Sequence, residues 1–174
     1  LILSIFFQCR FEFYESEFLL VWIQVEKVFF THWSKLIGKE IYDSFECIIF
    51  HMTDLPFGRG GSPLQNLIVR GITETKISAI QCEAGLDTGP VYLKRPLSLE
   101  GTAQEIYSRA NKVVESMILD ILLHSPVPLS QEGEVVDFKR RVPEDGNMEA
   151  LERWAGHIRY GNPWNGWEVF HIAV

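Results

Sequence analysis

The sequence predicts an α/β fold in which helices are layered on a β-sheet, and three observations carry this prediction. Short apolar runs typical of buried strands alternate with helical patterns from residue 28 to residue 124. The run Cys47–Phe50 is wholly apolar, as in strands buried on both faces of a parallel sheet. Thr102 and Glu105 form a capping-box pattern ahead of a long amphipathic stretch. In folds of this class, ligands bind beyond the carboxyl ends of the strands.

The individual elements follow from periodicity and from turn signals. Strands are expected at residues 28–30, 47–50, 75–82, 91–94 and 135–138. Helices are expected at residues 34–42, 62–71, 102–124 and 147–160. Ser62 and Pro63 give the second helix a capping hydroxyl followed by proline, and Gly71 ends it. Residues 51–61 and 83–90 are predicted to be loops.

Length and composition place further bounds on the protein. The 174 residues suffice for one compact domain, with an uncertain segment at 1–26, a core at 27–124 and a tail at 125–174. The chain begins at Leu1 with apolar runs that carry charges, so we read it as a fragment lacking its true beginning rather than as a membrane anchor. Three cysteines without C-x-x-C spacing predict no metal site and a reduced, cytoplasmic setting.

The charge balance bears on the partners of the protein. The chain has 16 Lys and Arg residues against 23 Asp and Glu residues, for a net charge of −7. Such a balance argues against nucleic-acid binding over a broad surface, because phosphate binding needs a basic face. The run Lys139–Arg141 is a local basic patch, which suits either a solvated surface or contact with a substrate phosphate.

His51 and Asp87 are the residues that we single out for chemistry. His51 directly follows the apolar strand, and its ordinary pKa near 6.5 suits proton transfer at neutral pH. The alternative is a histidine that satisfies a loop carbonyl. Asp87 lies between two glycines after the strand 75–82, where it is either a turn residue or a carboxylate that orients the histidine. Should the two strands be neighbours, both side chains would project into one crevice.

The loop after His51 contains a second set of candidates. Gly58, Gly60 and Gly61 surround Arg59 and permit close approach of the backbone to a ligand, but they do not match a phosphate-binding P-loop. Arg59 is able to hold a carboxylate or phosphate, or else to pair with a carboxylate such as Asp54.

Together, the two loops resemble the folate-dependent formyltransferase family, over roughly residues 28–123. The resemblance rests on the pattern His51-x-x-x-Leu-Pro-x-x-Arg-Gly-x-x-Pro-x-Gln65 and on Gly85-Leu-Asp-Thr-Gly89, some twenty residues later. Ser62-Pro-Leu-Gln65 is closer to the methionyl-tRNA and nucleotide-sugar branches than to the purine branch. The resemblance implies a Rossmann-like fold with three layers and a mostly parallel sheet, incomplete at its N-terminus.

The resemblance also implies the reaction and the residues that carry it. A formyl group would pass from 10-formyltetrahydrofolate to a primary amine, without a metal, and the catalytic pair would be His51 and Asp87. The family's asparagine falls on Ile49, so Thr53 or a backbone N–H would have to stabilise the oxyanion. The residues expected to bind the folate are Trp33, Ser34, Lys35, Leu36, Gln81, Gly85, Leu86 and Asp87. The residues expected to bind the substrate are Thr53, Arg59, Gly60, Gly61 and Gln65.

The identity of the amine and the activity itself have alternatives. The resemblance implies a further C-terminal domain in the members that act on methionyl-tRNA, whereas only about fifty residues follow the long helix here. Because the chain is also acidic, an amino sugar linked to a nucleotide is preferred over methionyl-tRNA as the acceptor. The substitution at Ile49 also allows a remnant without activity, and replacement of the amine by water would give a hydrolase that releases formate. Trp33 has a further interpretation as a tryptophan of the core or its rim. A homodimer is left open.

Overall fold

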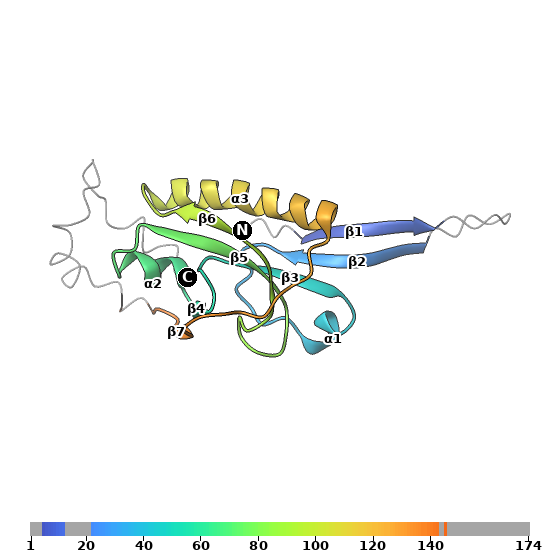
Figure 1. The fold of residues 1–174 in the computed structure, drawn as a ribbon, viewed down its shortest axis with the longest axis horizontal. Helices are drawn as coiled ribbons and strands as arrows, with labels where there is room; N and C mark the ends of the chain where they lie inside the picture. The colour runs from blue at the N-terminus through green and yellow to red at the C-terminus, as the bar shows by residue number, and fades with distance from the viewer. Residues whose placement is uncertain (1–4, 13–21, 143–144, 146–174) are drawn as a thin grey trace.

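A five-stranded sheet forms the centre of the molecule. The computed structural model describes residues 5–12, 22–142 and 145. The sheet has the strand order β1-β2-β3-β5-β6 (Figure 1). Its strands are β1 (Ile5–Glu12), β2 (Trp22–Phe30), β3 (Glu46–His51), β5 (Glu74–Gln81) and β6 (Val91–Ser98). The expected strand ending at residue 30 and the strands at 47–50 and 75–82 are confirmed to within a few residues.

The α/β, Rossmann-like fold class is confirmed, whereas the prediction of a mostly parallel sheet is wrong for the described strands. Within the five-stranded sheet as described, only β2 and β3 pair in parallel; the pairs β1–β2, β3–β5 and β5–β6 are antiparallel. The helix α2 (Pro63–Ile68) between β3 and β5 has six residues. Such a helix is about 9 Å long, too short to return the chain along a strand of about 20 Å. The chain therefore enters β5 at the end where β3 finishes and runs back beside it.

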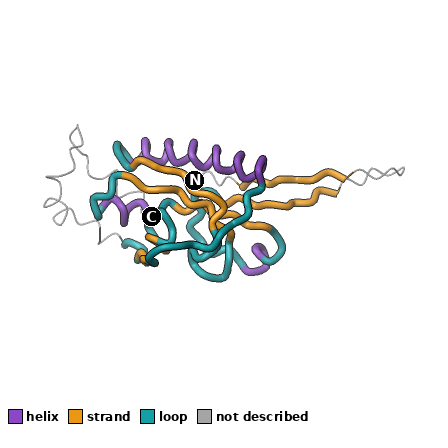
Figure 2. Tube along the Cα trace, viewed as in Figure 1, coloured by secondary structure: helices purple, strands orange, loops and turns teal. Residues whose placement is uncertain are grey.

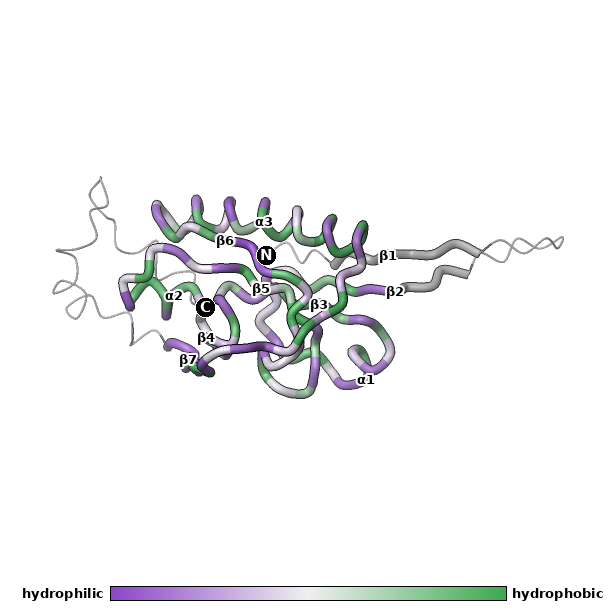
Figure 3. The backbone as a smooth tube through the Cα atoms, viewed as in Figure 1, coloured by the Kyte–Doolittle hydropathy of each residue, from purple (hydrophilic) through white to green (hydrophobic). Residues whose placement is uncertain are grey.

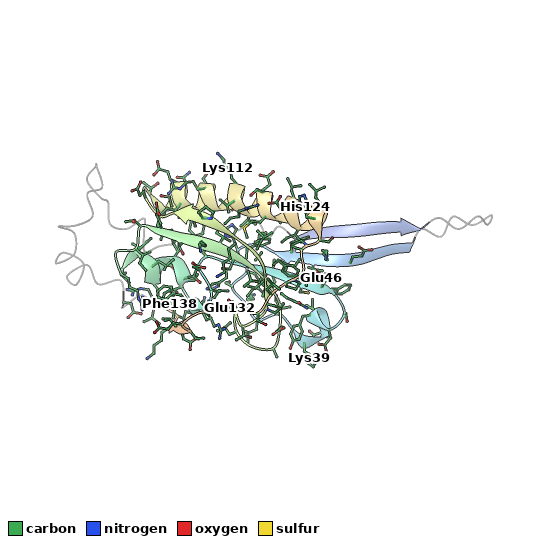
Figure 4. All side chains as sticks on the ribbon, in the orientation of Figure 1. Lys39, Glu46, Lys112, His124, Glu132 and Phe138 are labelled. Atoms are coloured by element: carbon green, nitrogen blue, oxygen red, sulfur yellow. The ribbon has the colours of Figure 1, made fainter. Side chains whose placement is uncertain are left out.

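The long helix α3 (Ala103–His124) covers one face of the sheet, over β5 and β6 (Figure 1). Its predicted capping box is present: the Thr102 hydroxyl accepts the Glu105 N–H, and the Glu105 carboxylate accepts the Thr102 N–H. Its hydrophobic side is turned toward the sheet (Figure 3), while Lys112 points away from it (Figure 4). The buried residues of α3 are Ala103, Ile106, Ala110, Val114, Met117, Ile118 and Ile121.

Because side chains alternate along a strand, β3 presents Ile48 and Phe50 to one face of the sheet and Ile49 and His51 to the other. The first face packs with the stripe of α3 in a large apolar cluster. On the other face, a smaller cluster contains Cys47 and Cys82 and extends to Ile41 of the short helix α1 (Lys39–Tyr42). We call this second side of the sheet the site face.

A two-stranded parallel sheet, β4 (Phe57–Gly60) with β7 (Val136–Phe138), lies beside the main sheet. The expected strand at 135–138 is thereby confirmed, and the predicted loop 51–61 contains a strand that only this pairing creates. Residues 126–135 join α3 to β7 without helix, crossing the molecule as a loop (Figure 2). We call this connection the strap.

Three predicted elements differ from the structure in their extent. The helix expected over 34–42 occupies only Lys39–Tyr42, after a loop that ends at Gly38. β6 continues through Pro96 to Ser98, because it is the edge strand and proline is tolerated where no neighbour needs its N–H. The helix expected over 62–71 occupies only Pro63–Ile68, and Ser62 does not cap it with its side chain: the φ of Ser62 is 51°, and its hydroxyl accepts the Arg141 N–H at 3.1 Å.

Other sequence predictions concern parts of the chain that the structure does not test. The helical stretch expected at 147–160 lies outside the described residues. The division into segments 1–26, 27–124 and 125–174 stays a prediction; β2 runs across its first boundary. In the described part of the chain, no helix is long and apolar enough to cross a membrane.

Candidate active site

His51 and Asp87 meet on the site face. His51 ends β3, and its Nδ1 lies 3.5 Å from Asp87 Oδ2. Both side chains are nearly buried, with exposed fractions of 8% and 10%. The same carboxylate oxygen accepts the Gly60 N–H at 2.8 Å. One oxygen thus joins the loop after β5 to the loop after β3, which is the juxtaposition that the sequence predicted for neighbouring strands.

The route by which Asp87 reaches His51 differs from the expected one. β3 and β5 are antiparallel, with His51 opposite Ser78 and Ile48 opposite Gln81, so β5 ends far from His51. The loop 82–90 folds back along the site face and brings Asp87 to the other end of the strands. Asp87 itself has a φ of 53°, a left-handed conformation that aspartate tolerates better than most residues.

Gly89 makes this return possible. A Cβ atom at Gly89 would overlap the carbonyl oxygen of Gln81, where the loop closes on its own entry strand. The Gln81 N–H donates to the Pro90 carbonyl at 2.9 Å in the same closure. A side chain at this position would therefore push the loop off the sheet.

Both ring nitrogens of His51 face oxygen acceptors. Nε2 lies 2.7 Å from the Gly58 carbonyl, and Nδ1 faces the Asp87 carboxylate. A carbonyl only accepts, so Nε2 carries the proton in that contact. The predicted alternative, a histidine that satisfies a loop carbonyl, therefore describes one half of what the ring does. The ring satisfies both neighbours when both of its nitrogens are protonated.

A buried hydroxyl network supports the loop that follows His51. Thr53 is fully buried and donates its hydroxyl to the Gly58 carbonyl at 3.2 Å. The hydroxyl of Ser78, also fully buried, donates to the Thr53 carbonyl at 2.7 Å and accepts the Leu55 N–H at 3.3 Å. Thr53 thus supports the loop from inside and has no exposed atom for the predicted contact with substrate.

Arg59 pairs with an amide rather than with a carboxylate. Its Nε and Nη2 donate to Oε1 of Gln131 at 3.1 and 2.8 Å. The carboxylate suggested as its partner, Asp54, binds Lys76 and Lys94 instead. Gln131 lies on the strap. The sequence did not indicate it as a site residue, because its partner Asp87 is 44 positions away and no motif surrounds this glutamine.

The other residues predicted for the substrate lie on or next to the same loop. Gln65 is buried in the first turn of α2. Gly61 lies against Arg140, and its N–H donates to the Phe138 carbonyl at 3.2 Å. The basic run Lys139–Arg141 therefore follows β7 directly alongside the loop of His51, with Lys139 and Arg140 exposed.

Most of the residues predicted for the folate occupy two surface loops of the site face, while Gln81 ends β5. Ser34, Lys35 and Leu36 are exposed, Leu36 to 85%, and precede α1. In the second loop, Gly85 is exposed and the exposed fraction of Leu86 is 59%. Both loops start beside the small cluster that contains Cys82. This open arrangement suits the edge of a ligand site.

Trp33 belongs to that small cluster rather than to the loop surface. Its ring packs edge-on against Phe30, with 5.4 Å between the ring centroids. This position matches the alternative of a core or rim tryptophan. Among the described residues, its buried indole N–H has no hydrogen-bond partner. A buried donor without an acceptor is costly, so this N–H is a candidate contact for a bound molecule.

Ile49 occupies the position of the family's asparagine. It lies on the same face as His51, opposite Ile80, and packs in the small cluster. The isoleucine side chain has no N–H to donate, so it offers an oxyanion only apolar surface. Thr53 does not take over this task in the described conformation, because its hydroxyl is committed to Gly58.

The two cysteines beneath the site are poor nucleophiles. Burial raises the pKa of Cys47 to about 11, and the neighbouring Cys82 adds to the shift. The pKa of Cys82 is raised as well, first by burial and then by the charges of Asp87 and Glu83. Both thiols stay protonated near neutral pH and act as apolar packing groups.

A separate cleft of about 280 Å³ opens near the start of β5. Its lining includes Asp54, Lys76 and Leu67, and none of the residues predicted for the site. Asp54 binds Lys76 at 2.9 Å and Lys94 at 2.6 Å in this region. Within the described ranges, no cluster of three or more His, Cys, Asp and Glu residues suits a metal ion.

The fold and the site define a class of protein: an α/β domain with a histidine–aspartate pair between two loops of one sheet face. No family model matches the chain. The methionyl-tRNA formyltransferase of Gluconobacter oxydans is 32% identical over 126 residues, which are 69% of this chain and 41% of that relative. The chain thus spans about four-tenths of the length of this curated relative.

Solved structures agree with the sequence relatives. A methionyl-tRNA formyltransferase from Clostridium thermocellum is 51% identical with a TM-score of 0.70, and the match covers 80% of this chain and 63% of that one. The formyltransferase PseJ from Anoxybacillus kamchatkensis, solved with a formamido sugar nucleotide and tetrahydrofolate, shares the fold at a TM-score of 0.55 and 15% identity, over 84% of this chain and 77% of that one. The chain belongs to the folate-dependent formyltransferase family.

Proposed function

We propose that this chain carries the part of a formyltransferase that moves a formyl group from 10-formyltetrahydrofolate to a primary amine. The observation that carries the proposal is the contact between His51 and Asp87, 36 positions apart and joined on one sheet face. An amine attacks a formyl carbon only when it is neutral, so the site needs a group that accepts its proton. Imidazole is suited to this at neutral pH, and a carboxylate beside it stabilises the protonated ring.

The present arrangement indicates what must move for the reaction. Nδ1 of His51 faces Asp87, so Nε2 is the nitrogen left to exchange a proton with substrate. Nε2 is held by the Gly58 carbonyl in the loop 51–61. We propose that this loop shifts when substrate binds, so that Nε2 leaves Gly58, loses its proton to solvent and can then accept the proton of the amine. Asp87 keeps the ring oriented throughout.

The donor would bind between the exposed loops 34–36 and 83–88. These loops contain six of the eight residues predicted for folate; Gln81 ends β5, and Trp33, whose indole N–H has no partner among the described residues, lies in the cluster beside the loops. The donor supplies the formyl group, and the chain's own residues orient it and handle the protons. Family membership supports this assignment.

For the acceptor, we propose a primary amine that carries phosphate. The exposed residues Lys139 and Arg140 lie next to the loop of His51, where they suit a phosphate group. Two kinds of molecule have this chemistry. The acidic chain and the fold shared with PseJ favour an amino sugar linked to a nucleotide. The names of the relatives from Gluconobacter and Clostridium favour methionyl-tRNA.

Incubation with 10-formyltetrahydrofolate tests the function directly. The protein is assayed for tetrahydrofolate and formylated product with no amine, with nucleotide-linked amino sugars, and with methionyl-tRNA. Turnover that requires an amine supports the transferase and identifies its acceptor, whereas formate released without an amine supports a hydrolase. Folate binding without turnover supports a remnant without activity, the reading that Ile49 favours, since loss of one oxyanion donor costs about 10²–10³-fold in rate.

Two histidine variants assign the chemistry. His51→Ala removes the proton-transfer group, and we expect turnover to fall at least about a hundredfold. His124→Ala is the matched control: His124 is exposed at the end of α3, where its Nδ1 contacts the Asp120 carbonyl, away from the proposed site. We expect it to keep wild-type turnover. Substantial turnover by the His51→Ala protein would show that the assigned base is wrong.

A further inference from the structure

The strap contains one side chain that ties both loops of the site together. Gln131 accepts Nε and Nη2 of Arg59 on its Oε1, at 3.1 and 2.8 Å. Its Nε2 donates to the carbonyls of Asp87 and Gly89, each at 2.8 Å. An amide has two N–H donors and two acceptor positions, so this side chain is fully saturated. All four of its bonds go to the two loops that meet at the catalytic pair.

The strap is itself anchored on both sides of Gln131. Two residues earlier, Leu129 exchanges backbone hydrogen bonds with Val91, at 2.7 and 2.9 Å, where β6 begins. Five residues later, Val136 starts β7, which pairs with β4. The amide therefore extends from a fixed backbone and acts as a fixed point for the loops.

The loop that carries Asp87 needs such a fixed point. The Asp87 carboxylate reaches His51 only because the loop 82–90 folds back along the sheet. The backbone of Asp87 is in the left-handed conformation. A strained backbone persists when its surroundings hold it in place. Gln131 binds the carbonyl of Asp87 itself, so it fixes the residue at its main chain while Gly60 binds the side chain.

We propose that Gln131 is a positioning residue, which holds the Asp87 carboxylate against His51 by bonding the loop 82–90 to Arg59. It has no role in proton transfer, and it acts through Asp87. The effect on turnover rests on the proposed function, whereas the effect on the geometry of the pair does not.

The first test measures geometry without any substrate. The Gly60 N–H donates to Asp87 Oδ2, so its hydrogen exchange reports whether the carboxylate is in place. We expect Gln131→Ala to speed exchange of the Gly60 amide about tenfold or more, because two bonds to the loop are lost. The Cys82 amide, which donates to the Cys47 carbonyl at 2.8 Å at the start of the same loop, should keep its protection.

A second variant separates the two halves of the amide. Gln131→Glu keeps oxygen acceptors for Arg59 but has no N–H for the carbonyls of Asp87 and Gly89. We expect it to speed Gly60 exchange as Gln131→Ala does. Gln104→Ala and Gln104→Glu are the matched controls, since Gln104 is exposed in the first turn of α3. Wild-type Gly60 exchange in either Gln131 variant would overturn the proposal.

The second test measures turnover in a double-mutant cycle. We expect Gln131→Ala to lower kcat about ten- to a hundredfold, because the Asp87 carboxylate is then no longer held in place against His51. In an Asp87→Asn background the same change should cost much less, since the residue through which Gln131 acts is already altered. Equal losses in both backgrounds would overturn the proposal. If the wild-type protein shows no turnover but Gln131→Ala still speeds Gly60 exchange, the result supports the positioning role of Gln131 and contradicts the proposed function.

Discussion

The two faces of the sheet are built on different physical principles. The face under α3 is covered by apolar side chains, among them Phe29, Ile77 and Met117, which are all fully buried. The site face combines a small apolar cluster with the buried polar residues His51, Thr53 and Ser78. The free energy gained by burying apolar side chains does not depend on their orientation and is roughly proportional to the area removed from water. Buried polar groups require a partner at one distance and angle, and most of these partners are distant in sequence.

This difference teaches which face supplies stability and which supplies chemistry. A side chain lost from the α3 face costs free energy of unfolding and leaves the catalytic pair in place. A polar group lost from the site face costs less stability but displaces a loop that holds the pair. The predictions below test this division, beginning with the largest effect.

Met117→Ala should give the largest loss of stability. Met117 is a fully buried residue of α3, so its truncation removes apolar contacts and leaves a cavity. We expect the free energy of unfolding to fall by about 2–5 kcal/mol, measured by urea denaturation. Leu119→Ala is the control on the same helix, because Leu119 is 53% exposed and should cost far less. A Met117→Ala protein that stays folded but loses Gly60 protection would contradict the separation of the two faces.

Ser78→Ala should give a smaller loss of stability together with a loss of function. Without its hydroxyl, the Thr53 carbonyl and the Leu55 N–H lose their partner in a fully buried place. We expect a cost of about 1–3 kcal/mol in the free energy of unfolding. The loop 51–61 should also loosen, which faster exchange of the Leu55 amide would report.

The control for this change is Ser116→Ala. The Ser116 hydroxyl donates to the Val113 carbonyl at 2.7 Å on the exposed side of α3, where water replaces the bond. It should change the free energy of unfolding by no more than about 0.5 kcal/mol. Equal costs for the two serine variants would mean that the buried network does not support the loop.

Asp54 should give the smallest effect, which we expect to see in the dependence of stability on pH and salt. Burial raises the pKa of Asp54, but hydrogen bonds and charge from Lys94 and Lys76 outweigh burial and lower it below 3.8. A carboxyl group whose pKa is lowered by folding stabilises the protein above its unfolded pKa, and this contribution is lost as the pH falls through the folded value. Asp54→Asn should therefore flatten the stability curve below about pH 4.

Salt provides the check on this last prediction. The Asp54 side chain is 41% exposed, so its pairs with Lys76 and Lys94 are screened. The difference between wild type and Asp54→Asn at pH 7 should shrink on raising the salt from 0.05 to about 1 M. A difference that persists at high salt would show that the Asp54 side chain stabilises the fold by contacts other than charge.

The local signals of the sequence predicted those elements whose causes are local. The capping box at Thr102 and the apolar stripe that follows it gave α3 from one end to the other, because both act within a few residues. The apolar run at Cys47–Phe50 gave β3 for the same reason. Failures occurred where a distant segment decided the outcome. Ser62 did not cap α2, because Arg141 binds its hydroxyl, and β4 exists only because β7 lies beside it.

By itself, the sequence determined that His51 ends a buried strand and that Asp87 lies in a glycine-rich turn; its motifs also indicated the family to which the chain belongs. Only the tertiary structure decided how these residues meet. β5 runs antiparallel to β3, so the loop 82–90 must fold back, and Gln131 from the strap binds it there. The physical reason is that strand and helix patterns depend on near neighbours, whereas a hydrogen bond between loops depends on where the whole chain brings its donors and acceptors.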